Sequence, residues 1–200
     1  MIARTANLAE SEALYAGLRM TADEYFALED DGHRYELIDG LVCMSPSPTS
    51  LHQIVQARIM GQLNDHVEST RCGEAMGDIS VYLRPGSRSG DIAYRPDIVF
   101  LRSEKLERNR DRIVEPPDLV VEIISLSSRR MDHETKREDY ERAGVGEYWI
   151  IDPLRREMLF LRLEGGKYVE VAPVSDKLES TSIPGFALDL ARVRNAFPTD

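Results

Sequence analysis

One glutamate, Glu122, lies inside an otherwise apolar run at residues 119–124, directly after Pro117 and Asp118. Successive side chains of a strand point to opposite faces, so this run predicts a strand covered on both sides, near the centre of a sheet. A carboxylate in such a place loses its water, which costs several kcal/mol unless a cation or strong hydrogen-bond donors replace it. We therefore expect a compensating group beside Glu122.

A second carboxylate, Asp97, follows Pro96 and precedes another apolar run. Asp118 lies about 13 Å from Glu122 along the same strand, too far to share a metal ion with it. Asp97 belongs to a different strand and can converge on Glu122 if the two strands are neighbours. Converging carboxylates raise each other's pKa unless a cation lies between them. Mg²⁺ prefers oxygen ligands and keeps waters that can become nucleophiles, so this pair predicts a Mg²⁺ site.

Lys136 is a candidate cation on the charged segment that follows. It shares a helical stripe with Asp132 and Tyr140, and Tyr140 is one of the few side chains there suited to face a sheet. This spacing predicts that Lys136 also points toward the sheet. The alternative is a surface pair with Asp132, worth a few tenths of a kcal/mol.

The order of the helices and strands that would position these residues predicts a mixed α/β or α+β domain. A capping box at Thr21 and Glu24 predicts a first helix. Further along, the patterns predict a hairpin turning at residues 39–40, helices at 50–69 and 128–143, and strands at 74–84, 97–102, 118–125 and 147–152, followed by two C-terminal strands joined at residues 165–166. The strand at 118–125, the next helix and the strand at 147–152 form a βαβ crossover.

The chain has 200 residues, enough for one domain, which we place at residues 21–197 after an N-terminal extension at 1–20. We expect a cytoplasmic protein, because no signal peptide or membrane-length apolar run is present and two cysteines form no disulfide framework. The net charge of −10 disfavours general nucleic-acid binding. The basic run at residues 102–112 leaves room for a local basic surface.

Several ordered motifs carry a family resemblance over residues 21–192: "YELIDG", a helix after "SPSP", "RPDIVF", "PDLVVEIISLSS", "KREDYERAGVGEYWIIDP" and "IPGFALDL". Together they resemble the Uma-two family of bacterial putative restriction endonucleases, within the PD-(D/E)XK nuclease superfamily. The resemblance implies a restriction-endonuclease-like core, with a mixed central sheet flanked by helices and extra C-terminal strands. It also implies an endonuclease that hydrolyses DNA phosphodiester bonds with Mg²⁺, or with Mn²⁺ in vitro.

The resemblance also assigns roles to individual residues. Asp97 and Glu122 match the two motif acids, and Glu36 matches an additional acid, so these three would hold the metal. Lys136 would complete the catalytic set, since the lysine that the superfamily pattern expects two residues after the second acid is replaced here by Ile124. His52 matches a helix histidine, to which we assign substrate binding.

Without the resemblance, other interpretations stay open. Glu36 fits the solvated face of a hairpin, and His52 fits a satisfied histidine at the edge of the core, on a stripe with Ile59 and His66. A catalytically inactive nuclease-fold module for assembly or regulation would suit the acidic net charge. A hydrolase of RNA or of a small phosphoester is a third alternative. For a DNA endonuclease we expect a homodimer, because two sites related by a two-fold axis suit the cutting of both strands.

Overall fold

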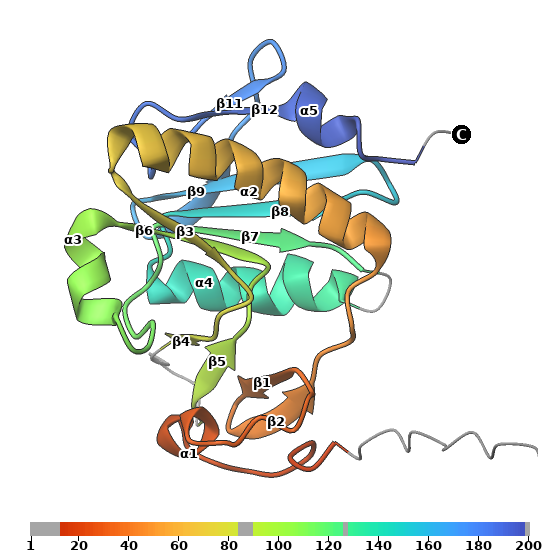
Figure 1. Ribbon diagram of the computed structural model, residues 1–200, viewed down its shortest axis with the longest axis vertical. Coiled ribbons are helices and arrows are strands. Elements are labelled where there is room, and N and C mark those ends of the chain that lie inside the picture. Colours follow the sequence, from red (N-terminus) through yellow and green to blue (C-terminus); the bar gives the residue numbers. More distant parts are fainter. Residues whose placement is uncertain (1–12, 84–89, 126–127, 199–200) are drawn as a thin grey trace, which may run out of the picture.

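A six-stranded mixed sheet forms the centre of the computed structural model, which describes residues 13–83, 90–125 and 128–198 (Figure 1). The strand order is β10-β9-β8-β7-β6-β3, and only β7 and β8 run parallel among these neighbours. The bounds are β3 (Gly73–Gly77), β6 (Ile98–Arg102), β7 (Leu119–Ile123), β8 (Glu147–Asp152), β9 (Glu157–Glu164) and β10 (Lys167–Glu170). The predicted central position of the strand that carries Glu122 is therefore confirmed.

One face of this sheet is covered by the long helix α2 (Ser50–Thr70), as Figure 1 shows. The apolar stripe predicted for this helix packs against the β7 side chains on the same face of the sheet, among them Val121 and Ile123. The C-terminal helix α5 (Leu190–Arg194) and the strands β11 (Lys177–Glu179) and β12 (Ala187–Asp189) complete this layer. The buried members of the stripe are Val55, Ile59, Leu63 and Val67.

The opposite face of the sheet is covered by α4 (Arg137–Ala143), which closes the predicted crossover between β7 and β8 (Figure 1). Tyr140 of this helix packs with Val120 and Tyr148 of the sheet. Gly144 ends the helix in the left-handed conformation, with φ +89°. The sequence predicts one regular helix from residue 128, but residues Met131–Lys136 form a π-helical segment, η2. Such wide turns occur often at functional sites.

A smaller antiparallel sheet, ordered β2-β1-β5-β4, lies beside the first one. Its strands are β1 (Tyr35–Ile38), β2 (Leu41–Met44), β4 (Val81–Leu83) and β5 (Ile92–Tyr94), and α1 (Ala22–Phe26) packs beside them with its capping box formed. The hairpin turns at Asp39 and Gly40, both with positive φ, as predicted. The strand predicted at 74–84 is instead divided into β3 and β4, because Asp78 has φ +58° between them.

The remaining short helices, α3 (Ser103–Leu106) and η1 (Glu107–Asn109), follow β6 within the basic run. Residues 13–20 of the predicted N-terminal extension run beside β2, where Gly17 donates to the carbonyl of Val42. Residues 1–12 lie outside the described part of the chain. Among the described residues, no helix has both the length and the apolar character needed to cross a membrane.

Candidate active site

Asp97 and Glu122 face each other at the end of two paired strands. β6 and β7 are antiparallel neighbours, and their register pairs Ile98 with Val121, so the next step along the ladder places Asp97 opposite Glu122. Both side chains are buried. The Asp97 carboxylate is fixed there because its Oδ2 accepts from the backbone N–H of Ile123 at 2.7 Å. The structure thus brings together the two carboxylates that the sequence predicted to converge.

The cation beside Glu122 is Lys136. Its Nζ lies 2.9 Å from Oε1 of Glu122, 3.0 Å from Oε1 of Glu36 and 3.5 Å from Oδ1 of Asp132. Lys136 is only 5% exposed and Asp132 only 2%, so the alternative of a surface pair is wrong. The ammonium is the group that compensates the buried carboxylate of β7.

Glu36 reaches this cluster from β1 of the smaller sheet. Its Oε1 accepts from the backbone N–H of Arg95 at 3.0 Å, and its side chain is 12% exposed. Glu36 therefore points into the cluster and not into solvent, contrary to the hairpin-surface interpretation. The small sheet thus contributes directly to the site, since β1 and β5 are paired.

The first two turns of α2 position Asp97 from the other side. Nε2 of His52 lies 3.0 Å from Oδ2 of Asp97, and the side-chain amide of Gln56 donates to the backbone carbonyl of Asp97 at 2.7 Å. Thr49 caps this helix by accepting from the N–H of His52. Nδ1 of His52 is buried and has no hydrogen-bond partner within the described residues. His52 thus contacts a predicted metal-binding acid and also lines the cavity described next.

These side chains line one open cavity of about 90 Å³. The loop at residues 45–49 forms one wall, and Arg34 and Arg95 lie at another edge. The predicted site residues that line it are Glu36, His52, Asp97, Glu122 and Lys136, together with Asp132. The cavity connects the cluster to solvent.

Comparison with known proteins decides the family. The family model Uma2, described as putative restriction endonuclease, matches residues 22–191. The chain belongs to the Uma2 family. No curated protein matches it. The crystal structure of a putative nuclease of the DUF820 group from Anabaena variabilis is similar to this Uma2 protein, with a TM-score of 0.73 and 18% identity over 88% of this chain and 98% of the other. The fold is restriction-endonuclease-like, as predicted.

In this Uma2 chain the lysine that contacts Glu122 comes from η2 and not from the strand. Ile124, at the position where the superfamily pattern has lysine, is buried in the core beside Tyr140. Lys136, one turn before Tyr140 in sequence, supplies the ammonium to Glu122. The hydroxyl of Tyr140 donates to the same Glu122 oxygen at 3.0 Å. The prediction that Lys136 faces the sheet is confirmed.

Asp132 and Tyr94 are two neighbours of Lys136 that the sequence did not identify as site residues. Asp132 is the fourth carboxylate of the cluster, and the Tyr94 ring centroid lies 5.2 Å from Nζ of Lys136. The helical stripe shared by Asp132 and Lys136 could have identified the first. Nothing in the sequence places Tyr94 there, because it comes from β5 of the other sheet.

The cluster holds more carboxylates than cations, and its pKa values shift accordingly. Burial raises the pKa of Glu122 well above its usual range, and the neighbouring carboxylates add to this effect although Lys136 opposes it. Burial likewise raises the pKa of Asp132. For Lys136, burial opposes the charged form, but the three carboxylates around it outweigh burial and raise its pKa. One lysine therefore does not fully compensate the acids of this Uma2 site.

The donor set fits a hard divalent cation in its chemistry. Carboxylate oxygens are the ligands that Mg²⁺ prefers, and an added cation would offset the excess negative charge. Oδ1 of Asp132 is buried and makes no hydrogen bond within the described residues. No group of three acidic, histidine or cysteine side chains in the described ranges is already arranged around an ion position. The Lys136 ammonium instead lies among three of the carboxylates.

The raised pKa of Glu122 predicts a pH dependence of stability. The folded state binds the carboxyl proton of Glu122 more tightly than the unfolded chain does. Protonated Glu122 therefore adds to the unfolding free energy, fully below the ordinary pKa of 4.5, and this addition is lost as the pH rises through the raised pKa. Glu122→Gln removes this titration. We expect wild type to lose more unfolding free energy than Glu122→Gln as the pH rises above 4.5. Denaturant unfolding at several pH values measures this, and parallel curves would contradict it.

Proposed function

We propose that this protein is a Mg²⁺-dependent endonuclease that hydrolyses DNA phosphodiester bonds. The observation that supports this most directly is the buried cluster of Glu36, Asp97, Glu122 and Lys136 at an open cavity. A carboxylate buried in a central strand costs folding free energy, so a purely structural module gains little from retaining it. Membership in a family of putative restriction endonucleases supports the same class of activity.

Each side chain of the cluster has a role in this proposal. Asp97, Glu122 and Glu36 would hold the Mg²⁺, which supplies positive charge to the scissile phosphate and lowers the pKa of a bound water. The Lys136 ammonium would orient the attacking water and stabilise the charge that develops on phosphorus. His52 and the N–H of Ile123 hold Asp97 in place, and His52 also lies where a substrate phosphate would enter.

Metal dependence is the simplest test of this proposal. Supercoiled and linear duplex DNA, incubated with the protein and Mg²⁺ or Mn²⁺, should be cleaved, and EDTA should remove the activity completely. Parallel reactions with RNA and with a small phosphodiester separate DNA hydrolysis from the two other hydrolase classes. Cleavage that persists in EDTA would contradict the metal-dependent mechanism, and cleavage of the small ester alone would contradict the DNA substrate.

A non-catalytic nuclease-fold module is the alternative, and the ion pairs of Lys136 favour it, because they close the cluster without any metal. The net charge of −10 points the same way, since DNA binding depends on cations that meet phosphates. A protein that neither cleaves nucleic acid nor is stabilised by Mg²⁺ would support this alternative. Homodimerisation is part of the proposed function, and light scattering of the purified protein tests it.

A further inference from the structure

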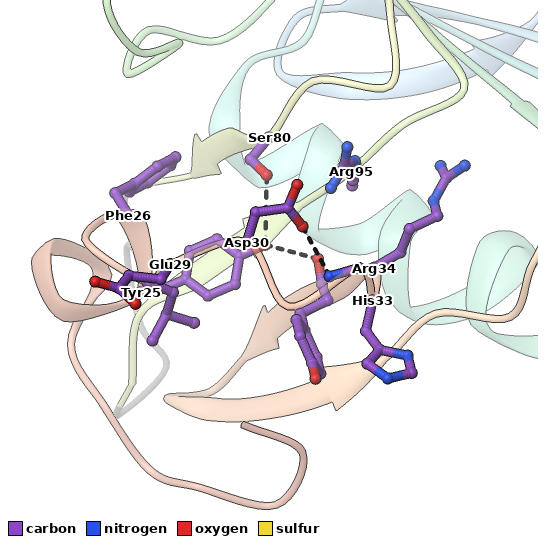
Figure 2. Close-up of a pocket in the computed structure, with 11 residues that line it drawn as sticks. Tyr25, Phe26, Glu29, Asp30, His33, Arg34, Ser80 and Arg95 are labelled. Atoms are coloured by element: carbon purple, nitrogen blue, oxygen red, sulfur yellow. Dashed lines mark hydrogen bonds between the residues drawn. The ribbon is translucent and has the colours of Figure 1, made fainter. Parts of the chain in front are cut away.

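A second pocket, of about 440 Å³, adjoins the catalytic cavity and shares two arginines with it (Figure 2). The aromatic side chains Tyr25, Phe26 and Tyr35 form part of its lining. Arg34 and Arg95 lie on the same side of this pocket in Figure 2, and both also line the cavity that holds Lys136. The two arginines therefore line both the catalytic cavity and the larger pocket.

Both arginines converge on one oxygen atom. Nη2 of Arg34 lies 2.5 Å, and Nε of Arg95 2.7 Å, from the same Oδ1 of Asp78. Two guanidinium groups aimed at one anionic oxygen form the arrangement that also binds a phosphate oxygen. Arg95 connects this point to the catalytic cluster, because its backbone N–H donates to Glu36.

The Asp78 carboxylate that pairs with the two arginines is partly exposed to solvent. Its side chain is 47% exposed, against 26% for Arg34 and 29% for Arg95. Exposed ion pairs contribute little to stability, so another anion can compete for the arginines. Asp78 also has φ +58°, a conformation that asparagine adopts readily. Nε of Arg34 is buried and makes no hydrogen bond within the described residues.

We propose that Arg34 and Arg95 bind a backbone phosphate of the nucleic-acid strand beside the scissile phosphate, and that Asp78 covers this site in the free protein. This inference rests on the proposed nuclease function. With one phosphate at the Lys136 cluster, a neighbouring phosphate reaches the arginines in place of Asp78, and the strand continues toward the aromatic pocket of Figure 2. Arg34 and Arg95 supply the local positive charge that an acidic protein needs to bind a polyanion.

The test uses variants with opposite expected effects on binding. Fluorescence anisotropy with labelled single-stranded and duplex oligonucleotides, in EDTA to prevent metal-dependent cleavage, reports affinity at several salt concentrations. Arg34→Gln and Arg95→Gln should each weaken binding about tenfold and reduce the salt slope by about one. Asp78→Asn should tighten binding several-fold, because it removes the negative charge that competes with a phosphate for the two arginines, although Arg95 keeps its bond to the backbone carbonyl of residue 78. A merely structural role of the three residues would not produce tighter binding.

The chain contains a matched control at its other end. Asp176 also has a positive φ, and its Oδ1 lies 2.5 Å from Nη2 of Arg194, the last residue of α5. Asp176→Asn should therefore leave affinity unchanged. Equal affinity of wild type, Asp78→Asn and the arginine variants would overturn the phosphate site, as would tighter binding by Asp176→Asn to the same extent. Thermal unfolding of each variant confirms that the comparison is between folded proteins.

Failure of this inference is distinguishable from failure of the proposed function. If wild type cleaves DNA with Mg²⁺ but the arginine variants bind like wild type, the phosphate site is wrong and the nuclease stands. If the variants change affinity as predicted but neither wild type nor any variant cleaves DNA with Mg²⁺, the phosphate site stands and the catalytic proposal fails. Absence of nucleic-acid binding by wild type and by Asp78→Asn would overturn the phosphate site.

Discussion

Glu122→Gln is expected to lower the rate of DNA cleavage by about 10²- to 10³-fold or more while the protein stays folded. Glutamine keeps the size of the side chain but removes the charge that would hold the metal. At neutral pH the unfolding free energy should be unchanged or increased, because the cluster loses a buried carboxylate that Lys136 compensates only in part. Cleavage rates measured with Mg²⁺, together with denaturant unfolding, give both quantities.

Glu68→Gln is the matched control for this change, because Glu68 is an exposed glutamate on α2. It should alter neither rate nor stability. Full cleavage activity in Glu122→Gln would contradict the assignment of the catalytic cluster. A strongly destabilised Glu122→Gln would show instead that the carboxylate serves mainly as the structural partner of Lys136.

Lys136→Met should lose both stability and activity. The substitution keeps an unbranched side chain but removes the cation that lies between Glu36, Glu122 and Asp132. Breaking a buried ion pair on one side costs about 3–5 kcal/mol, because uncompensated charge remains. The loss should be smaller at acid pH, where the carboxylates protonate, and added Mg²⁺ should recover part of it.

Arg130→Met provides the control on the same stretch of chain. Arg130 pairs with Glu134 at 3.4 Å, but both side chains are largely exposed, so the pair is worth at most about 1 kcal/mol. Unfolding of the two variants by urea, with the midpoint and the slope both fitted, compares them directly. If Lys136→Met were as stable as Arg130→Met at neutral pH, the ammonium would not be the main compensation for the buried acids.

The central strand and its partners could be predicted from the sequence, because their patterns are local. An apolar run with one carboxylate identified β7, and helical spacing predicted that Lys136 of η2 points toward the sheet, as Tyr140 of α4 does. The pairing of β6 with β7 was an assumption of the sequence argument, and the structure confirms it. These parts of the site follow from the regular spacing of side chains along a single strand or helix.

The rest of the site depends on contacts between distant segments, which no local pattern encodes. Glu36 reads as a surface residue of a hairpin, and only the packing of the small sheet against the large one turns it toward Lys136. The π-helical segment at Met131–Lys136 was not predicted, because the side-chain pattern of six residues does not distinguish i→i+4 from i→i+5 hydrogen bonding. The break at Asp78 was also missed.

Glu36, Asp97 and Glu122 are proposed to hold a divalent cation beside Lys136. Crystals of the full chain soaked in Mn²⁺, with anomalous diffraction data, test it most directly. We expect one or two manganese ions bound to these carboxylates with oxygen distances of about 2.0–2.3 Å. A cluster that stays free of manganese at millimolar concentration, with Lys136 still bound between Glu36 and Glu122, would contradict the metal-dependent nuclease and favour the non-catalytic module.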